Sequence, residues 1–403
     1  MAKLAILGFG TVGSGIPEVL RTNAEKIYRR LGEELAVKYI LDVRDFSQHP
    51  DAGLFVREIE LILADPEVAV VAEAIGGLTP AFGYVCRALD AGKHVVTSNK
   101  ELVAVHGAEL LARAKQNGGC FLFEASVGGG MPLIAPLHEN LAPNRITAVA
   151  GIVNGTTNFM LTMMERQGLE FDEALRQAQQ LGYAETGDPS ADVDGLDAGR
   201  KIAILSSLCF GRHIHPQDIS LRGIRSITAQ DMQAASSFGA AVRLIAWANA
   251  DGQGSFACGV EPMLVSRENP LSAVDDVYNA VQAACDMLGR VQFYGRGAGR
   301  LPTAAAMVTD AIEALKIGVS LHDSLFWQAA SPRGELWPDT GCYRYYLRVQ
   351  SPEGAAGLLP GAQQADEGAL LLDEPLAADA FSALRRQLEE KGCAVTQAMK
   401  WLD

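Results

Sequence analysis

The sequence predicts an α/β protein whose N-terminal part is a doubly wound parallel sheet. Short apolar runs alternate with helical segments from residue 3 to residue 125, and this alternation is typical of parallel sheets covered by helices on both faces. A glycine-rich turn, GFGTVG, directly follows the first run. After residue 125 the alternation of apolar runs and helical segments becomes irregular. This predicts a central α+β domain and a short C-terminal α+β module.

The elements of the N-terminal part follow from the apolar runs and from the residues that end them. Five runs indicate buried strands, each followed within two residues by a polar residue or glycine. The predicted strands are Lys3–Leu7, Ala36–Leu41, Val68–Ala74, His94–Lys100 and Cys120–Ala125. The predicted helices are Thr11–Leu35, Phe55–Leu63, Pro80–Ala91 and Glu101–Gln116.

The rest of the chain is interpreted in the same way. We expect a strand at 146–153, and helices at 156–167, 173–181, 198–209 and 302–316. In the tail we expect strands at 343–349, 369–372 and 394–402 and a helix at 378–391. The predicted domains are therefore 1–131, completed by 297–335, then 132–296, and finally 340–403.

Composition narrows the class of protein. A net charge of −14 without a basic patch makes nucleic acid an unexpected partner. The seven cysteines are scattered and form no CxxC pair, so they indicate neither a zinc site nor a disulfide framework and fit a reducing cytoplasm. We expect no signal peptide and no membrane span, because no suitable apolar run is present.

The first turn predicts dinucleotide binding. Gly8-x-Gly10-x-x-Gly13 follows a strand and opens a helix, which is the arrangement of a Rossmann-type pyrophosphate site. At the end of the second strand, Asp42 would hold a ribose diol and favour NAD, whereas Arg44 would accept the extra phosphate of NADP. Both residues are present, so the cofactor is NAD or NADP, with a mild preference for NADP.

The stretch from Leu181 to Lys201 carries the strongest candidate for chemistry. Five acidic side chains, Glu185, Asp188, Asp192, Asp194 and Asp197, precede a lysine that opens an apolar helix. Asp197 and Lys201 are four residues apart and therefore share one helix face. An ordinary helix salt bridge is the alternative, but beside a dinucleotide motif the pair suggests a lysine that transfers a proton.

Three further segments allow two interpretations each. Lys100, with Thr97 and Ser98, follows the fourth strand at the edge where parallel sheets bind ligands, but it could be an ordinary surface lysine. The loop 124–132 could hold a cation by its carbonyl oxygens or act as a hinge, which the residue types alone favour. Residues 154–158 could contact substrate or cap a helix.

These motifs together resemble one family. GFGTVGSG, EAIGG, AGKHVVTSNKEL, FEASVGGGMPLI, GIVNGTTNFML, LGYAE, DVDGLDAGRKIAIL and GRGAGRLPTAAAMVTD occur in the order and spacing of homoserine dehydrogenase. The resemblance extends to about Asp310. It implies NAD(P)-dependent interconversion of L-aspartate 4-semialdehyde and L-homoserine in threonine and methionine biosynthesis, by direct hydride transfer. It also implies a substrate-binding and dimerisation role for 132–296, and a homodimer or homotetramer.

The resemblance implies roles for individual residues. Lys201 matches the proton donor, Asp197 the residue that orients it, and Lys100 a residue that assists at the carbonyl. Glu185, with Asp192, matches the site for the substrate's ammonium group. Together with Arg44, the implied cofactor positions are Gly8, Phe9, Gly10, Thr11, Val12, Gly13, Thr97, Ser98, Lys100, Gly182 and Gly299. A possible sodium site of backbone carbonyls, which replaces the hinge interpretation, is implied at Glu124, Val127, Gly129 and Met131.

Two segments depart from the family pattern. The loop ETGDP, residues 185–189, is one residue longer than the usual E-x-D-P, which shifts Asp188 but leaves Asp192, Asp197 and Lys201 in register. The tail resembles a ligand-binding ACT domain, but after residue 349 it has little room for that domain's first helix. We therefore expect a truncated module, and the sequence does not decide whether it binds a feedback amino acid.

Two other functions fit parts of the sequence. Phosphorylating oxidation of the same aldehyde would need an activated cysteine beside a histidine, and no such pair is evident around Cys86 or Cys120. A sensing protein without catalysis would need the dinucleotide domain and the tail, but not both lysines and the acidic stretch.

Overall fold

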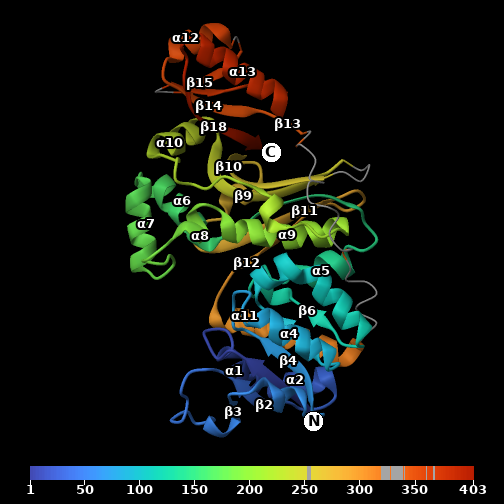
Figure 1. The fold of residues 1–403 in the computed structure, drawn as a ribbon. Helices are drawn as coiled ribbons and strands as arrows, with labels where there is room; N and C mark the ends of the chain where they lie inside the picture. Colours follow the sequence, from blue (N-terminus) through green and yellow to red (C-terminus); the bar gives the residue numbers. More distant parts are fainter. Residues whose placement is uncertain (252–255, 319–326, 328–338, 340, 360, 366–367) are drawn as a thin grey trace. The chain divides into compact units, whose positions relative to one another are not determined.

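The structure is a computed structural model that describes residues 1–251, 256–318, 327, 339, 341–359, 361–365 and 368–403 (Figure 1). The chain divides into two compact units. Unit 1 comprises Met1–Ile146, Ala203–Gln217 and Gly295–Arg333, and unit 2 comprises Thr147–Ile202, Asp218–Tyr294 and Gly334–Asp403. Much of the segment expected to complete the first domain lies outside the described residues, so the domain boundaries stay a prediction.

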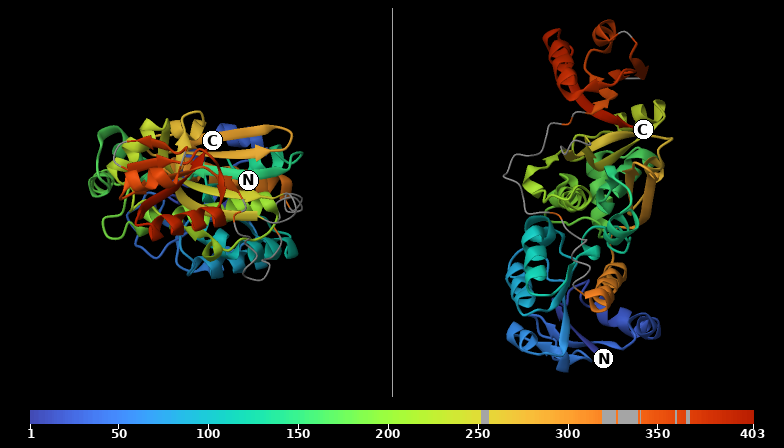
Figure 2. Two further views of the ribbon diagram at one scale, coloured as in Figure 1. Left: turned by 90° about the horizontal axis from the view of Figure 1, so that it is seen from above. Right: turned by 90° about the vertical axis from the view of Figure 1, so that its right-hand side faces the viewer.

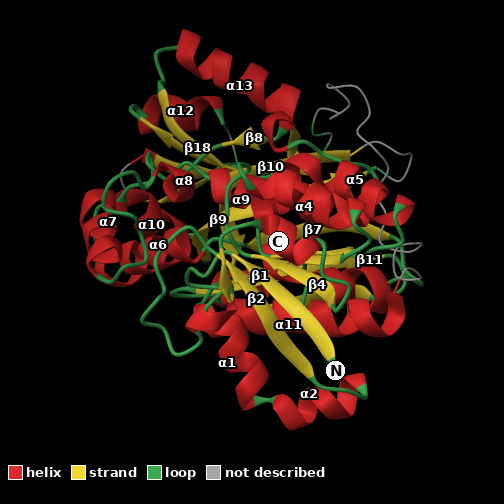
Figure 3. Cartoon of the chain, turned by 60° about the horizontal axis from the view of Figure 1, so that its bottom comes forward, coloured by secondary structure: helices red, strands yellow, loops and turns green. Residues whose placement is uncertain are grey.

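Unit 1 contains a six-stranded sheet in which every neighbouring pair is parallel, and this confirms the predicted fold class. The strand order is β3-β2-β1-β4-β5-β6, and Figure 3 shows β1, β2 and β4 side by side. The order reverses between β1 and β4, and sheets of this type bind ligands there, beyond the carboxyl ends of the strands. The strands are β1 (Ala2–Leu7), β2 (Leu35–Leu41), β3 (Phe55–Val56), β4 (Val68–Glu73), β5 (His94–Thr97) and β6 (Phe121–Leu122).

The predicted helix Thr11–Leu35 is wrong in its bounds and its continuity. A turn occupies residues 11–14, and α1 (Gly15–Thr22) begins only after it. The backbone of Asn23, with φ of −112° and ψ of 21°, interrupts the helix before α2 (Ala24–Leu31). The apolar pattern continues across this break, which is why periodicity alone does not detect it.

The other predicted helices of this unit are better placed. The predicted helix Phe55–Leu63 is partly wrong, because its first two residues pair with β2 as β3 before α3 (Ile59–Leu63) starts. Helices α4 (Ala81–Asp90) and α5 (Lys100–Gln116) confirm the predictions to within a residue at each end. The fifth predicted strand is shortened to β6, since a 3₁₀ turn at Glu124–Ser126 follows it.

Helix α11 (Arg300–Ile317) also belongs to unit 1 and packs closely on α1. A Cβ atom on Gly15 would lie 2.9 Å from the Cβ of Ala304, so a larger residue would push the two helices apart. Arg300, at the start of α11, forms an ion pair with Glu18 of α1. The predicted helix at 302–316 is thereby confirmed.

Unit 2 is built on a mixed ten-stranded sheet ordered β12-β11-β7-β9-β10-β18-β14-β16-β15, with β8 paired to β10. The strand predicted at 146–153 and the helices predicted at 156–167, 173–181 and 198–209 are confirmed with small shifts of their ends. The elements are β7 (Ile146–Ile152), α6 (Gly155–Gln167), α7 (Phe171–Gln180), α8 (Ser190–Val193), α9 (Leu196–Phe210), β8 (Ser220–Leu221), α10 (Ala229–Ser237), β9 (Ala240–Ala250), β10 (Phe256–Ser266), β11 (Tyr278–Cys285) and β12 (Gly289–Arg296).

The tail of unit 2 forms a β-α-β-β-α-β module, shown from two sides in red in Figure 2. Its four strands pair antiparallel in the order β18-β14-β16-β15, which is a ferredoxin-like arrangement. The elements are β14 (Tyr345–Val349), α12 (Pro352–Leu358), β15 (Gln363–Ala365), β16 (Ala369–Leu371), α13 (Ala378–Glu390) and β18 (Val395–Leu402), with the short pair β13 (Cys342–Tyr343) and β17 (Leu376–Ala377) beside them.

The expectation that the tail lacks its first helix is wrong. Helix α12 fits between β14 and β15 because its seven residues make about two turns. Both helices pack on the strands through one apolar cluster, in which the rings of Tyr345 and Phe381 stack at 3.7 Å. That the module is an ACT domain stays a prediction.

The core of unit 2 contains a fully buried arginine. Arg243 of β9 holds the loop before β11 and the end of α6 together through five hydrogen bonds. Their acceptors are the carbonyl oxygens of Val242, Ser272 and Val274 and the carboxylates of Glu165 and Asp275. These five hydrogen bonds offset the free-energy cost of removing the charged guanidinium from water.

Replacing this arginine is expected to destabilise the protein strongly. Arg243→Met would leave Glu165 and Asp275 without their buried partner, and breaking a buried pair costs about 3–5 kcal/mol. Arg267→Met is the matched control, since Arg267 pairs with the same Glu165 but is 47% exposed and should cost at most about 1 kcal/mol. Urea unfolding measures both, and equal losses would contradict this account.

Candidate functional site

The three glycines of the first turn have three different surroundings. Gly8 follows β1 with φ of 89°, a left-handed conformation that glycine adopts without strain. A Cβ atom on Gly13 would lie 1.9 Å from the carbonyl oxygen of Gly8, so this glycine permits the close approach of turn and strand. Around Gly10, an added Cβ would meet no atom of the described residues within 4 Å. The turn is therefore tight on its inner side and open at its middle glycine.

The end of β2 is closed by an ion pair. Asp42 accepts hydrogen bonds from the backbone N–H of Phe9 at 2.7 Å and from Arg44, whose Nη2 lies 2.8 Å away. The Arg44 guanidinium holds the pKa of the Asp42 carboxyl well below its usual range, although burial acts in the opposite direction. Hydrogen bonds from the backbone N–H groups of Arg44 and Phe9 lower this pKa further. The Asp42 carboxylate is thus already engaged, while Arg44 is half exposed.

The ring of Phe9 is packed, and Thr11 and Val12 lie in the turn that follows. Phe9 makes edge-on contacts with Phe46, His49 and Phe55 at centroid distances of 5.1–5.4 Å. Thr11 is exposed and Val12 is half-buried. Of the residues proposed at this turn, Phe9 therefore offers a packed ring, and its backbone N–H is already bonded to Asp42.

The carboxyl ends of β4 and β5 are organised by a residue that the sequence analysis missed. Glu73, fully buried at the end of β4, accepts hydrogen bonds from the N–H of Ile75 at 2.8 Å and from the hydroxyl of Thr97. Burial raises the pKa of Glu73. Thr97 in turn accepts from the N–H of Asn99, which caps α5. Glu73 stands at the end of a predicted strand, in the motif EAIGG, and this position was the sequence signal for a functional residue there.

The predicted residues Ser98 and Lys100 flank this network. Both are half-buried, and Lys100 is the first residue of α5. Gly299, predicted near the cofactor from the GRGAG motif, directly precedes α11 with φ of 140° and accepts from the N–H of Thr303 at 3.0 Å. All three residues lie in unit 1 with the glycine turn.

The loop expected to bind sodium is held by a carboxylate at its start. The Glu124 side chain accepts hydrogen bonds from three successive backbone N–H groups, those of Leu133, Ile134 and Ala135, at 2.6–2.9 Å. Its own backbone N–H donates to the buried Asp310 of α11 at 2.9 Å. The carboxylate of Glu124 is therefore occupied by these three hydrogen bonds, which fix the start of the loop.

Close backbone packing shapes the rest of this loop. Gly129 has φ of 59°, and a Cβ there would lie 2.6 Å from the carbonyl oxygen of Gly297. Val127 and Met131 are buried, and the N–H of Met131 donates to the carbonyl of Gly128 at 2.9 Å. In the part of the chain that the structure describes, no group of three or more His, Cys, Asp or Glu residues could hold a metal ion.

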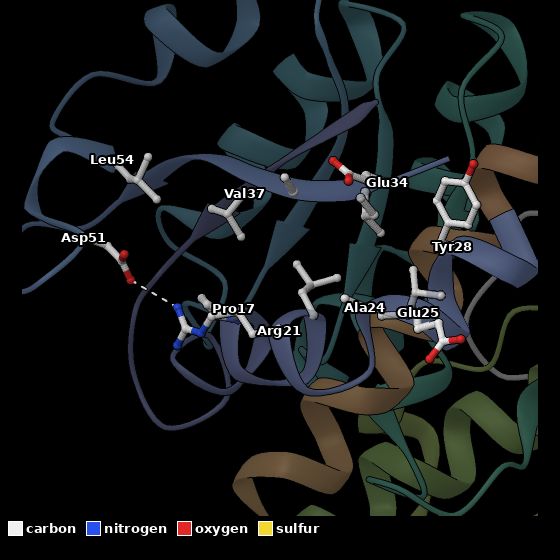
Figure 4. Close-up of a pocket in the computed structure, with 13 residues that line it drawn as sticks. Pro17, Arg21, Ala24, Glu25, Tyr28, Glu34, Val37, Asp51 and Leu54 are labelled. Carbon is white, nitrogen blue, oxygen red and sulfur yellow. Dashed lines mark hydrogen bonds and ion pairs between the residues drawn. The ribbon is translucent and has the colours of Figure 1, made fainter. Parts of the chain in front are cut away.

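A hollow in unit 1 is lined by residues outside the glycine turn of residues 8–13 (Figure 4). It has a volume of about 510 Å³ and follows α1, α2 and the amino end of β2. Arg21 and Asp51 form an ion pair at its rim, with 3.4 Å between Nη1 and Oδ2. Ligands of doubly wound sheets bind at the carboxyl ends of the strands, so this hollow is not the dinucleotide site.

The junction between β7 and α6 in unit 2 gathers a buried cluster of charged groups. Lys201 of α9 donates to the carbonyl oxygen of Val153 at 2.7 Å and pairs with Asp197 at 2.9 Å. Asn154 donates from Nδ2 to Asp192 at 2.7 Å and to Asp197 at 3.0 Å. Lys201, Asp197 and Asn154 are less than one-tenth exposed. We call these five residues, 153, 154, 192, 197 and 201, the lysine cluster.

Neighbouring groups of the lysine cluster shift the pKa of Asp192 in opposite directions. Burial raises the pKa of its carboxyl, the Asn154 amide lowers it, and the charge of Asp197 raises it again. Thr156, next to the junction, lowers the Asp192 pKa by hydrogen bonding and donates to the carbonyl of Tyr183 at 2.7 Å. The segment NGTTN, residues 154–158, therefore caps α6 and also bonds the acidic residues of the cluster. The sequence alone did not decide between helix capping and a role in the site.

The remaining acidic residues of the stretch have other roles. Asp188 accepts from the N–H of Ser190 at 3.0 Å at the start of α8. Asp194 forms two bonds with Arg225, the shorter at 2.6 Å. Glu185 lies on the exposed loop after α7. The structure thus brings Asp192 and Asp197 to the lysine, and leaves Asp188 and Asp194 in structural contacts.

Gly182 ends helix α7. It adopts φ of 74°, and the following residue, Tyr183, donates from its N–H back to Ala178 at 2.8 Å, which is a common helix C-terminus. A Cβ on Gly182 would meet none of the described atoms within 4 Å. Its conformation is explained by the turn, and its role near a cofactor stays a prediction.

The cysteines named in the alternative chemistry are not activated. Burial raises the pKa of Cys86, and burial raises the pKa of Cys120 to about 11. The Sγ of Cys120 also donates to the carbonyl of Gly318 at 3.0 Å. Because the thiolate is the nucleophile, neither residue is suited to phosphorylating oxidation.

A parallel sheet with this glycine turn places the protein in the class of Rossmann-type dinucleotide-binding proteins. The family model "Homoserine dehydrogenase, NAD binding domain" matches residues 8–124, and the model "Homoserine dehydrogenase" matches residues 132–312. The chain belongs to the homoserine dehydrogenase family, whose members are NAD(P)-dependent oxidoreductases. A nicotinamide dinucleotide is accordingly its cofactor.

Relatives and solved structures agree with this family. A homoserine dehydrogenase of Synechocystis is 44% identical over 80% of this chain and 75% of its own, and one of Lactococcus lactis is 39% identical over 89% and 84%. The crystal structure of a homoserine dehydrogenase from Thiobacillus denitrificans, 33% identical, matches 100% of this chain and 98% of its own with a TM-score of 0.88. No helix among the described residues has the length and apolar character needed to span a membrane.

Asp310 gives a pH prediction. Burial raises the pKa of this carboxyl well above its usual range, and the neighbouring Glu124 charge adds to the effect. A carboxyl with a raised folded pKa stabilises the protein at low pH, and this stability is lost as the pH rises toward that pKa. Asp310→Asn, which stays neutral and keeps an acceptor for the Glu124 N–H, should gain stability over wild type as pH rises.

Urea unfolding at about pH 5 and pH 8 measures this difference in unfolding free energy, which should be about 1.4 kcal/mol for each unit by which the folded pKa is raised within that window. Asp310→Leu is the control, since it removes the acceptor and should destabilise at both pH values. A stability difference between wild type and Asp310→Asn that does not change with pH would contradict the prediction.

Proposed function

We propose that this protein catalyses the NAD(P)-dependent interconversion of L-homoserine and L-aspartate 4-semialdehyde. The observation that carries the proposal is the lysine cluster, in which a buried ammonium group is held between a carbonyl oxygen and a carboxylate within a chain of the homoserine dehydrogenase family. A buried lysine with fixed partners is positioned to exchange a proton. The step would serve threonine and methionine biosynthesis.

The proposed roles follow the residues. Lys201 gives a proton to the aldehyde oxygen during reduction and takes it from the hydroxyl during oxidation, and Asp197 orients it at 2.9 Å. Lys100 assists by stabilising the negative charge on that oxygen. Asp192 and Glu185 bind the substrate's ammonium group. Oxidation requires neutral Lys201 and should therefore increase toward alkaline pH.

The dinucleotide would be held by the glycine turn and by the ends of β4 and β5. The open backbone at Gly10 fits a pyrophosphate, and Thr97, Ser98 and Lys100 stand at the carboxyl edge of the same sheet. When bound, the nicotinamide ring supplies or accepts the hydride. The residues of the protein itself would orient Lys201 and bind the amino-acid substrate.

The lysine can be tested directly. Lys201→Ala should lower kcat for L-homoserine oxidation by about 10²–10⁴-fold, because it removes the proton-transfer group, while the affinity for the dinucleotide stays nearly unchanged. Formation of reduced nicotinamide, followed by its absorbance, measures kcat with NAD and with NADP. Lys26→Ala, at an exposed lysine of α2, is the matched control. Near-normal turnover of Lys201→Ala would remove Lys201 from the mechanism.

We further propose that NADP is preferred over NAD. Asp42 is already bonded to Arg44 and to the N–H of Phe9, whereas the half-exposed Arg44 guanidinium can receive a phosphate at the strand end. A hyperthermophilic archaeal homoserine dehydrogenase, 31% identical with a TM-score of 0.66 over 78% of this chain, was solved in complex with NADPH.

Arg44→Gln should raise the KM for NADP by about 10- to 100-fold, the worth of a hydrogen bond to a charged group. The KM for NAD should change little, since NAD lacks the phosphate. Arg21→Gln, which removes another exposed arginine paired with an aspartate, is the control and should alter neither KM. An equal effect of Arg44→Gln on both dinucleotides would contradict the assignment.

Sodium binding by the loop 124–131 is part of the same proposal. The Glu124 carboxylate is bonded to three N–H groups, so its backbone carbonyl would act together with those of Val127, Gly129 and Met131. Carbonyl oxygens suit a hard cation. We also propose that the protein forms a homodimer or homotetramer through 132–296, that it works in the cytoplasm, and that 340–403 is an ACT-like module.

A further inference from the structure

We propose that Asn154 is a positioning residue for the lysine chemistry, holding Asp192 and Asp197 in fixed orientations beside Lys201. The inference rests on the proposed function and deepens it. One amide nitrogen, Nδ2, donates both of its hydrogens, to Asp192 Oδ1 at 2.7 Å and to Asp197 Oδ2 at 3.0 Å. The same Oδ2 atom of Asp197 lies 2.9 Å from the nitrogen of Lys201. The amide therefore fixes the oxygen that pairs with the lysine.

The orientation of this amide is set by its other end. Asn154 Oδ1 accepts from the backbone N–H of Thr157 at 2.9 Å and from the Thr157 hydroxyl at 2.9 Å. A backbone N–H can only donate, and an ionised carboxylate can only accept. A flipped amide would oppose its NH₂ to the N–H and its oxygen to two carboxylates, so only one orientation satisfies all four contacts.

Helix capping alone does not explain an asparagine here. Asn154 is the N-cap of α6, and serine, threonine or aspartate would serve that purpose about equally well. Among these residues, only asparagine combines an acceptor for the helix N–H with two donors for the carboxylates. Aspartate would cap the helix but would add a third negative charge beside Asp192 and Asp197.

The charges of the cluster explain what the donors contribute. The ammonium of Lys201 pairs with Asp197 of α9 and also attracts Asp192 of α8, while the two carboxylates repel each other. The amide bridges both carboxylates and so offsets part of this repulsion. Without it, both groups would take up protons more readily, and Asp192 would bind a cationic substrate less well at moderately acidic pH. Lys201 also lies next to this junction, because it donates to the carbonyl of Val153.

The test compares Asn154→Ser and Asn154→Asp with wild type in L-homoserine oxidation. Both variants keep an oxygen that can cap α6, and both lose the donors. In Asn154→Ser, kcat/KM for L-homoserine should fall by about 10- to 100-fold, as expected for lost hydrogen bonds to charged groups. The acid limb of its pH profile should move to higher pH, and the KM for the dinucleotide should be unchanged. Asn154→Asp should lose more.

A control and a second measurement separate positioning from stability. Asn269→Ser alters another buried N-cap asparagine, which bonds the N–H of Leu271 and the carbonyl of Asp403; it should lower Tm without moving the pH profile. Asn154→Ser should lower Tm more at about pH 8 than at about pH 5, since the lost bonds are to ionised carboxylates.

The outcomes are distinct. A wild-type protein that does not oxidise L-homoserine with either dinucleotide removes the proposed function, and the Tm comparison still decides the role of the amide. If Asn154→Ser loses the same Tm at both pH values, or keeps the wild-type pH profile, Asn154 is only a helix cap and the inference is overturned.

Discussion

The buried ion pair between Lys201 and Asp197 is the interaction on which the lysine cluster depends. Removing an ammonium and a carboxylate from water costs several kcal/mol for each ion, and one contact between them repays this only when further hydrogen bonds complete both groups. Here the carbonyl of Val153 serves the ammonium and the amide of Asn154 serves the carboxylate. Because these two residues are adjacent, burial of the lysine depends on the segment between the end of β7 and the start of α6.

The fold was predictable wherever the signal is local. Buried strands and helices have their own periods, and the glycine turn marks where β1 ends. The errors lie where the decisive contact is distant or conformational. Two residues at Phe55–Val56 become a strand only because β2 offers an edge. The break at Asn23 is a backbone conformation that the apolar pattern does not record. In the tail, the segment judged too short still forms α12.

The candidate site, like the fold, was predictable where the residues that interact are close in sequence. The spacing of Asp197 and Lys201 places them on one helix face, and the structure pairs them. Which other carboxylates join them depends on partners far along the chain. Asp194 is taken by Arg225, 31 residues away, whereas Asp192 is held by Asn154, 38 residues before it. Apart from Asp197, the spacing does not show which acidic residues of this stretch reach the lysine, and the fold decides it through these distant partners.

The tail module is joined to the lysine cluster by the sheet itself. Its last strand, β18, pairs in parallel with β10, and β10 pairs with β9, which pairs with β7. Side chains reinforce the first of these joints, because the buried Lys400 of β18 pairs with Glu261 at 2.9 Å and lies over the ring of Trp247. Val153 and Asn154, which hold Lys201 and Asp197, directly follow β7, so the tail module and the lysine cluster are connected through one hydrogen-bonded sheet. The register of that sheet therefore constrains both.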